Sequence, residues 1–479
     1  MAVYLLATLD TKGPEAAFVR DRLVSVGLTV RLVDTGCLGV PSVAPDISRE
    51  HVFAAADTTL AAAGASSRGD AVAAAAVGAE RLVRAAFAAG ELDGVVALGG
   101  SAGTTIGTAA MRALPLGVPK LMVSTLASGQ TRPFVRDKDI LMLNPIVDIA
   151  GLNRVSRPVL AEAAAALAGM VKFGLGTVSP SSFGGEQADA PASRPLVAAS
   201  MFGVTTPCVQ RARQELEQAG YEVLVFHATG NGGEALESLV ADGVIAGVLD
   251  ITTTELADEL VGGVLSAGPQ RLTAASRVGV PQVVSVGALD MVNFGPRETV
   301  PARFSDRRFH IHNSAVTLMR TTPAENAALG AEIARKVANS NGPAAILLPL
   351  RGVSALDRDG QPFNDPEARK TLYDAIRAAW RRVGLPIVRE WGHVEGPGER
   401  RVEGRGEGHG EGQGEGRVEG HSEGQGGAVQ LAVPRVLREM DCHINDEAFA
   451  VAAARELISL MKWRESALGG RIDGVVSQG

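Results

Sequence analysis

Aromatic side chains are scarce in this 479-residue chain: phenylalanine, tryptophan and tyrosine together make up only 4% of it. The hydrophobic fraction is nevertheless 46%, so the core has to be built from alanine, valine, leucine and isoleucine. Parallel sheets covered on both faces by alanine-rich helices have this composition. We therefore expect an α/β fold, and the length predicts about two to three domains.

Cysteine and positive charge are also in short supply. The three cysteines, Cys37, Cys208 and Cys442, are far apart and form no CxxC pair, which favours a reducing compartment. The net charge of −7 argues against nucleic acid or an anionic membrane as the main partner. Residues 1–10, MAVYLLATLD, lack a basic leader, and their apolar run is too short for a signal peptide or a membrane span. We expect a cytoplasmic protein.

The two halves of the chain follow the same order of predicted elements. A strand and a loop over residues 3–13 lead into an amphipathic helix over 14–27, and a second strand follows. Residues 196–230 repeat this order, so we predict two lobes with the same βαβ organisation. The predicted domains are residues 1–180 and 196–479, with a Ser-, Pro- and Gly-rich linker at 181–195.

One stretch breaks the pattern. Residues 396–427 consist almost entirely of glycine, glutamate, arginine, histidine and glutamine, with little that is apolar to bury. We interpret them as a disordered insert in a surface loop of the second lobe. His409 and His421 within it are candidates for weak metal binding only, and a solvated insert is the favoured interpretation.

A glycine loop follows the apolar run Val95–Leu98 and precedes an alanine-rich stretch. Successive glycines let backbone N–H groups converge on an anion, and the helix that follows adds its partial positive end. Serine and threonine hydroxyls in the loop are candidate donors to phosphate. The alternative is a tight strand-to-helix turn whose glycines serve packing alone. The loop matches neither GxxxxGK[ST] nor GxGxxG.

Two further polar loops, residues 8–13 and 124–131, are expected at the same sheet edge, because parallel strands end there together. Lys12 is a candidate phosphate contact and Asp10 a candidate ribose or Mg²⁺ contact, although Asp10 and Thr11 also suit helix capping. Together the three loops favour a nucleotide site. Its predicted residues are Asp10, Thr11, Lys12, Gly99, Gly100, Ser101, Gly103, Thr104, Thr105, Ser124, Thr125, Ala127, Ser128 and Gly129.

The second lobe carries acids, bases and arginines on the corresponding edge, enough for acid–base catalysis or for a divalent metal. Two of its histidines alternate along a predicted strand, which places them on one face. For each residue the alternative is a helix cap or a polar turn. The candidate catalytic residues are Asp250, Glu255, Asp290, His310, His312, Arg320, Arg351 and His443.

Several blocks of the sequence, among them ATLDTKGPE, GGSAGTT, NPIVDIAGLNR, ATGNGGEALE and DCHINDEAFA, resemble the Tm-1-like ATP-binding family, also called UPF0261. The blocks follow the family's order from residue 5 to about residue 460. The resemblance implies two Rossmann-like α/β subdomains with mainly parallel sheets, ATP binding in the first, and self-association. The resemblance assigns no reaction, and the pattern of the family does not include the insert at residues 396–427.

Three functions remain open at this point. The leading hypothesis is an ATP-binding protein, with Mg²⁺, whose second lobe holds an unidentified small-molecule substrate for phosphoryl or adenylyl transfer, with Asp250 or Asp290 as base. The second is a nucleotide-sensing protein without turnover. The third is an NAD- and metal-dependent dehydrogenase, since two loops are similar to those of iron-containing dehydrogenases; their aspartate is missing after the glycines here. Alanine-rich helices such as residues 71–89 favour a homo-oligomer.

Overall fold

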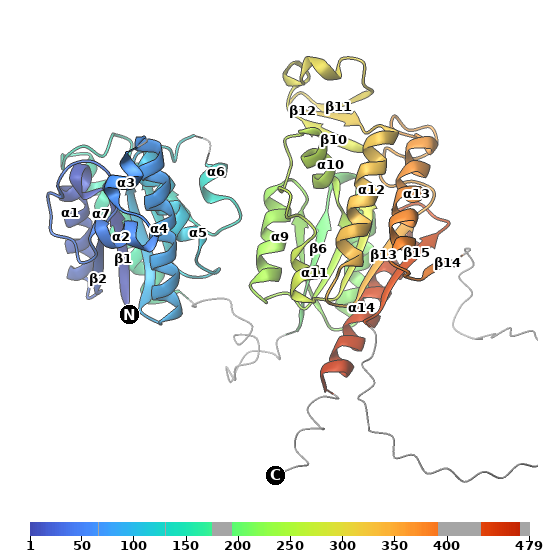
Figure 1. Cartoon of the computed structure of the whole chain (residues 1–479), viewed down its shortest axis with the longest axis horizontal. Coiled ribbons are helices and arrows are strands. Elements are labelled where there is room, and N and C mark those ends of the chain that lie inside the picture. Colours follow the sequence, from blue (N-terminus) through green and yellow to red (C-terminus); the bar gives the residue numbers. More distant parts are fainter. Residues whose placement is uncertain (66, 130, 175–193, 391–432, 470–479) are drawn as a thin grey trace, which may run out of the picture. The chain divides into compact units, whose positions relative to one another are not determined.

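The computed structural model describes residues 1–65, 67–129, 131–174, 194–390 and 433–469 (Figure 1). Most of the predicted linker and the whole predicted insert lie outside these ranges. The chain divides into two compact units. The first comprises Met1–Leu196, Phe226–Ile245 and Ala267–Ala274, and the second Val197–Val225, Ala246–Ser266 and Ala275–Gly479.

The first unit is built on a five-stranded parallel sheet with the strand order β2-β1-β3-β4-β5. Every residue of β1 is buried, as expected for a strand covered on both faces. The strands are β1 (Ala2–Ala7), β2 (Val30–Asp34), β3 (Leu92–Gly99), β4 (Lys120–Ser124) and β5 (Leu141–Leu143).

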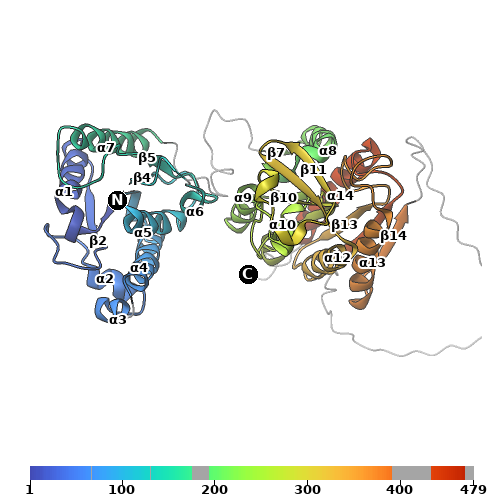
Figure 2. The ribbon, with the colours of Figure 1, turned by 90° about the horizontal axis from the view of Figure 1, so that it is seen from above.

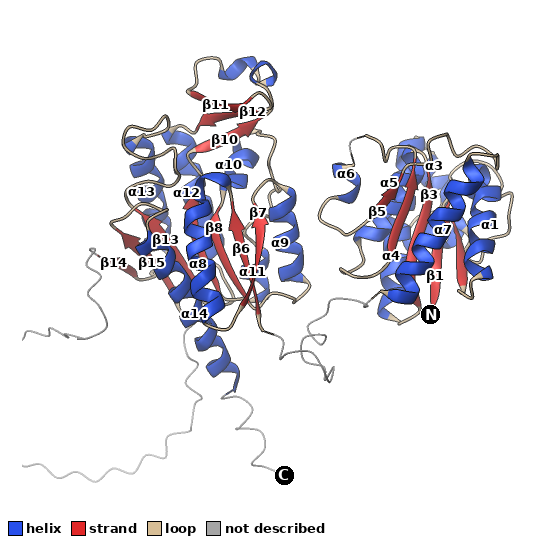
Figure 3. Ribbon diagram, turned by 180° about the vertical axis from the view of Figure 1, so that it is seen from behind, coloured by secondary structure: helices blue, strands red, loops and turns tan. Residues whose placement is uncertain are grey.

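Helices cover both faces of this sheet (Figure 3). Val3 and Leu5 of β1 pack in the same cluster as residues of α1 and α7, whereas Tyr4 and Leu6 pack with residues of α4 and α5. Alternate side chains of one strand therefore contribute to two hydrophobic cores. The helices are α1 (Leu9–Ser25), α2 (Arg49–Ala55), α3 (Leu60–Gly64), α4 (Arg68–Ala88), α5 (Ser101–Arg112), α6 (Arg132–Val135) and α7 (Ser156–Phe173).

Helix α1 begins earlier than the sequence predicts. It starts at Leu9 rather than Pro14 and contains a break at Lys12, whose φ of −127° and ψ of 15° are not helical. A single turn therefore follows β1, and the longer helix resumes near Pro14, since the ring of proline suits the first turn of a helix. Because β1 ends at Ala7, Asp10, Thr11 and Lys12 lie at the carboxyl edge of the sheet.

A seven-stranded sheet, which lies in the second unit except for Leu196, Phe226 and His227, has the order β14-β15-β13-β9-β8-β6-β7. Within it β14, β15, β13, β9, β8 and β6 pair in parallel. Its first four strands in sequence lie in the order second, first, third, fourth, as in the first sheet, which confirms the predicted repeat of βαβ organisation. The strands are β6 (Leu196–Met201), β7 (Glu222–His227), β8 (Gly247–Thr252), β9 (Gln282–Gly287), β13 (Ala344–Pro349), β14 (Ile387–Glu390) and β15 (Arg435–Met440).

A smaller antiparallel sheet, β10-β12-β11, stands at one end of the larger one (Figures 1 and 2). Its strands are β10 (Met291–Phe294), β11 (Phe309–Asn313) and β12 (Val316–Arg320). No helix in the described ranges combines the length and the apolarity needed to cross a bilayer. The remaining helices are α8 (Thr206–Gln218), α9 (Asn231–Ala241), α10 (Thr254–Val261), α11 (Ala274–Val278), α12 (Pro323–Ala338), α13 (Pro366–Arg382) and α14 (Glu447–Gly469).

Candidate functional site

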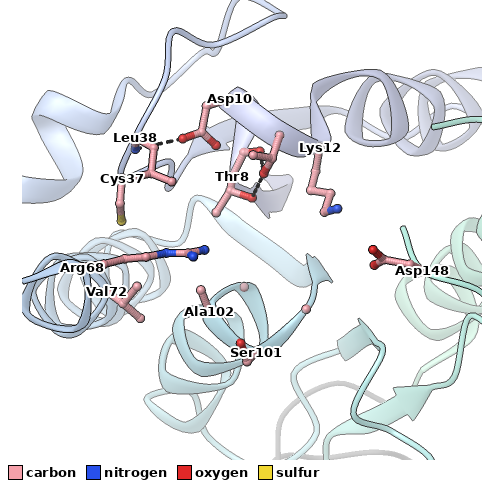
Figure 4. A pocket seen from close by; sticks show the side chains of 13 residues that line it. Thr8, Asp10, Lys12, Cys37, Leu38, Arg68, Val72, Ser101, Ala102 and Asp148 are labelled. Atoms are coloured by element: carbon pink, nitrogen blue, oxygen red, sulfur yellow. Dashed lines mark hydrogen bonds between the residues drawn. The ribbon is translucent and has the colours of Figure 1, made fainter. Parts of the chain in front are cut away.

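The first sheet has its topological switch point between β1 and β3, because the chain leaves β1 toward β2 and returns on the other side of β1. Open α/β sheets bind ligands at the strand carboxyl ends beside such a point. A pocket of about 260 Å³ opens there (Figure 4). It is lined by Thr8, Asp10, Thr11, Lys12, Cys37, Leu38, Arg68, Val72, Gly100, Ser101, Ala102, Gly103 and Asp148.

The glycine loop ends in this pocket as the N-terminus of α5. Gly100 is the N-cap residue, and the N–H groups of the first helical turn have no acceptor within the helix. A Cβ on Gly99 would lie 2.8 Å from the Cα of Gly103, so those two glycines let the helix approach the strand. Gly100 has more room, since its Cβ would meet nothing nearer than 3.7 Å. Gly99 and Gly103 therefore serve close packing, whereas Gly100 leaves open space at the N-terminus of α5.

Asp10 and Lys12 tie neighbouring loops to the pocket. One carboxylate oxygen of Asp10 accepts hydrogen bonds from the backbone N–H groups of Leu38 (2.9 Å) and Gly39 (3.2 Å). Its other oxygen is buried and has no partner in the described part of the chain. The ammonium of Lys12 donates to the carbonyl oxygen of Ile149. Both side chains are therefore held in place by contacts with neighbouring loops.

A buried ion pair supports the loop after β2. Asp34 and Arg49 are 2.7 Å apart, with side chains 1% and 5% exposed. Asp34 also accepts hydrogen bonds from the N–H groups of Leu9 and Gly36. In dinucleotide-binding folds an acid near this position binds the adenine ribose. Here that carboxylate is occupied by Arg49 and by the backbone.

The remaining predicted first-lobe residues lie around the pocket without lining it. Thr104 is fully buried, and its hydroxyl lies 2.6 Å from that of Ser124. The hydroxyl of Thr105 donates to the carbonyl oxygen of Ser101 at 3.0 Å. The residues that follow β4 are likewise absent from the lining, namely Thr125, Ala127, Ser128 and Gly129.

Sequence reasoning missed several lining residues, including Cys37, Arg68 and Asp148. Burial is the main cause that raises the pKa of the Cys37 thiol, and the charge of Asp10 adds to it. Arg68 and Asp148 are exposed, and neither forms a salt bridge within the described ranges. Asp148 lies in the block NPIVDIAGLNR, which carries the family resemblance without assigning this carboxylate a role. Arg68 opens the alanine-rich α4, where composition carries no functional signal.

In the second unit, Asp290 is fully buried and accepts a 2.7 Å hydrogen bond from the Ser354 hydroxyl. Its other carboxylate oxygen has no partner among the described residues. Burial, and then the charge of Asp357, raises the pKa of Asp290 to about 7. Ser354 and Asp357 belong to the polar stretch LPLRGVSALD, in which sequence reasoning selected only Arg351.

Arg320 and His443 join the same buried cluster. Arg320 donates to the carbonyl oxygen of Phe363 at 2.8 Å and lies 3.7 Å from Asp357. The Nε2 atom of His443 lies 2.9 Å from the Ser354 carbonyl oxygen, and its Nδ1 accepts from the backbone N–H of residue 445. Burial lowers the pKa of His443. The cluster therefore holds loops together, and its side chains have little access to solvent.

The other second-lobe candidates do not converge on one point. Asp250 accepts from the Ser200 hydroxyl at 2.7 Å, and Glu255 is fully buried in α10. Arg351 is exposed and paired with Asp441 at 2.7 Å. His310 packs edge-on against Phe363, whereas His312 is exposed. Among the described residues, no three His, Cys, Asp or Glu side chains are placed to hold a metal ion.

Comparison with known sequences places both lobes in one family. Residues 1–175 match the "Uncharacterised protein family (UPF0261) N-terminal domain" and residues 194–398 its C-terminal domain. A UPF0261 protein of Clostridium tetani is 41% identical over 461 residues, covering 96% of this chain and 99% of that protein.

The tomato virus-resistance protein Tm-1(GCR237) is 42% identical over 389 residues, which cover 77% of this chain and 50% of that protein. Among solved structures, a UDP-N-acetylglucosamine 2-epimerase from Rickettsia bellii covers 59% of this chain and 78% of its own. Its TM-score of 0.20 and identity of 12% are too low to support an argument.

Proposed function

This chain belongs to the UPF0261 family, and on that premise we propose that it binds ATP, with Mg²⁺, in the pocket at the β1/β3 switch point. The observation that carries the proposal is the convergence of Lys12, Arg68 and the N-terminus of α5 on one pocket. Two cations and an open helix N-terminus favour a phosphate group.

The residues present fit the phosphates better than they fit a whole nucleotide. A volume of about 260 Å³ lies below the roughly 300–1,000 Å³ usual for ligand sites. The phosphate chain therefore occupies the pocket, and the base lies toward its rim. Asp148 offers the exposed carboxylate that would hold Mg²⁺, which prefers carboxylate and phosphate oxygens.

The proposal is for binding, with turnover as a separate question. Asp250 and Asp290 are buried and hydrogen-bonded to serine hydroxyls, so neither is placed to act as a base in this structure. A nicotinamide dinucleotide is not proposed, because the carboxylate of Asp34 is committed to Arg49. The geometry therefore favours a nucleotide-binding protein over a dehydrogenase.

Calorimetric titration with ATP, with and without Mg²⁺, tests the proposal. Gly100→Asp places a carboxylate at the N-terminus of α5 in a spot with room for a Cβ. Gly169→Asp introduces the same charge in α7, where a Cβ meets nothing within 4 Å. We expect ATP binding by the wild type and by Gly169→Asp, and its loss in a folded Gly100→Asp.

No binding by the wild type, or equal binding by all three proteins, would contradict the proposal. Phosphate release in the same samples distinguishes turnover from binding alone. Self-association, which we also propose, is measured in these samples by light scattering with and without ATP.

A further inference from the structure

The two cations of the pocket are held differently. Lys12 is anchored, because its ammonium donates to the Ile149 carbonyl oxygen. Arg68 is exposed and forms no ion pair with any carboxylate in the described ranges. It is the first residue of α4, whose N-cap Ser67 accepts from the Asp70 N–H at 3.1 Å. Figure 4 shows the guanidinium reaching into the pocket from a different element and a different side than Lys12.

Arg68 lies at the positive end of α4, a position that Asp70 in the same turn offsets only in part. The N-terminus of a helix carries a partial positive charge, and a cation in the first turn is repelled by it. The guanidinium also extends over Ala102 in the first turn of α5, a second helix N-terminus (Figure 4). The carboxylate of Asp10 also lines the pocket, but no ion pair joins it to Arg68 in the described part of the chain. An anion bound between Arg68 and α5 would relieve this repulsion.

We propose that Arg68 is the residue that makes this pocket select ligands with two or more linked phosphates. Lys12 and the N-terminus of α5 hold one phosphate, and Arg68 holds the adjoining one with its planar, multidentate guanidinium. Because the cations enter from different sides, a single phosphate does not engage both fully. The inference rests on the proposed function, since it concerns the same pocket. It adds that the pocket recognises two or more linked phosphates.

The test is a calorimetric series on the full chain with inorganic phosphate, pyrophosphate, AMP, ADP and ATP. The variants are Arg68→Ala and Arg68→Lys, with Arg31→Ala as the matched control. Arg31 is exposed near the start of β2, at the end of the strand remote from the carboxyl edge. Circular dichroism confirms that each variant is folded.

We expect Arg68→Ala to weaken pyrophosphate, ADP and ATP by about tenfold or more, the range for loss of a charge-assisted contact. Phosphate and AMP should change by less than about twofold, Arg68→Lys should restore part of the loss, and Arg31→Ala should match the wild type.

If the wild type binds ATP and Arg68→Ala binds it equally well, the inference is wrong and the proposed function stands. An equal loss of affinity for AMP and ATP would also overturn it, because Arg68 would then not distinguish one phosphate from several. If the wild type binds neither pyrophosphate nor any nucleotide, the proposed function fails and takes the inference with it.

Discussion

The hydroxyl of Ser354 donates to one carboxylate oxygen of Asp290, and the other oxygen of that carboxylate is buried without a partner among the described residues. The pKa of Asp290 is raised to about 7, first by burial and then by Asp357. The carboxyl is therefore protonated in the folded chain at a pH where it is ionised in the unfolded chain.

The sign of the pH dependence follows from this. Between about pH 4 and pH 7 the folded state retains a proton that the unfolded state has lost, so this group lowers stability as pH rises. The slope is about 1.4 kcal/mol per pH unit for one proton. Asp290→Asn keeps an acceptor for Ser354 but cannot ionise. The free energy of unfolding of Asp290→Asn, relative to that of the wild type, should therefore increase between about pH 4 and pH 7 and stay constant above pH 7.

Urea unfolding followed by tryptophan fluorescence measures this difference. All three tryptophans, Trp380, Trp391 and Trp463, belong to the second half of the sequence, so the signal follows that half. A constant difference between variant and wild type from pH 4 to pH 8 would contradict the assignment.

Arg49→Met should destabilise the first unit strongly, because it leaves the carboxylate of Asp34 buried without its cation. Loss of one partner of a buried pair costs about 3–5 kcal/mol. The double variant Asp34→Ala/Arg49→Met should cost less than the sum of the two single changes. Hydrogen exchange of peptides from residues 1–60 reports on this region, which has no tryptophan. Additive effects would show that the two charges are not coupled.

Thr104→Val separates the sequence-based assignment of Thr104 from its place in the structure. The side chain is fully buried and its hydroxyl lies 2.6 Å from that of Ser124, so its loss should lower stability by about 1–3 kcal/mol. ATP affinity should change by less than about twofold, because Thr104 does not line the pocket. A direct hydrogen bond from Thr104 to ATP would make the change larger than that. Thermal unfolding and calorimetry measure the two effects. A large loss of ATP affinity in a variant of unchanged stability would show instead that Thr104 contacts the phosphates.

Cys37 gives an independent view of the pocket. Its thiol lines the pocket, and burial and Asp10 raise its pKa, so alkylation should need a more alkaline pH than for an ordinary thiol. Bound ATP should slow the reaction further, because it covers the thiol and adds negative charge. Intact mass measured over time follows the modification, and Cys37→Ser identifies the site. An alkylation rate at Cys37 that ATP leaves unchanged would place the nucleotide elsewhere.

The sequence was sufficient to predict the glycine loop, the early Asp-Thr-Lys segment and their common edge of the sheet. Each prediction rests on local pattern: apolar runs mark buried strands, and parallel strands end on one side. The identities of Lys12 and Gly100 as pocket residues follow from that rule. The sequence-based start of α1 at Pro14 was wrong, because the helical turn from Leu9 to the break at Lys12 carries no separate periodic signal.

By itself, then, the sequence determined the α/β class, the repeated βαβ organisation and the family. Only the tertiary structure decided which polar side chains face a pocket and which are buried. Thr104 and Arg68 show why: the glycine motif predicts a ligand contact at Thr104, and no motif marks Arg68. Their roles depend on what the neighbouring elements place beside them, Ser124 next to Thr104 and an open pocket in front of Arg68. Burial and charge pairing are long-range properties that a local pattern does not encode.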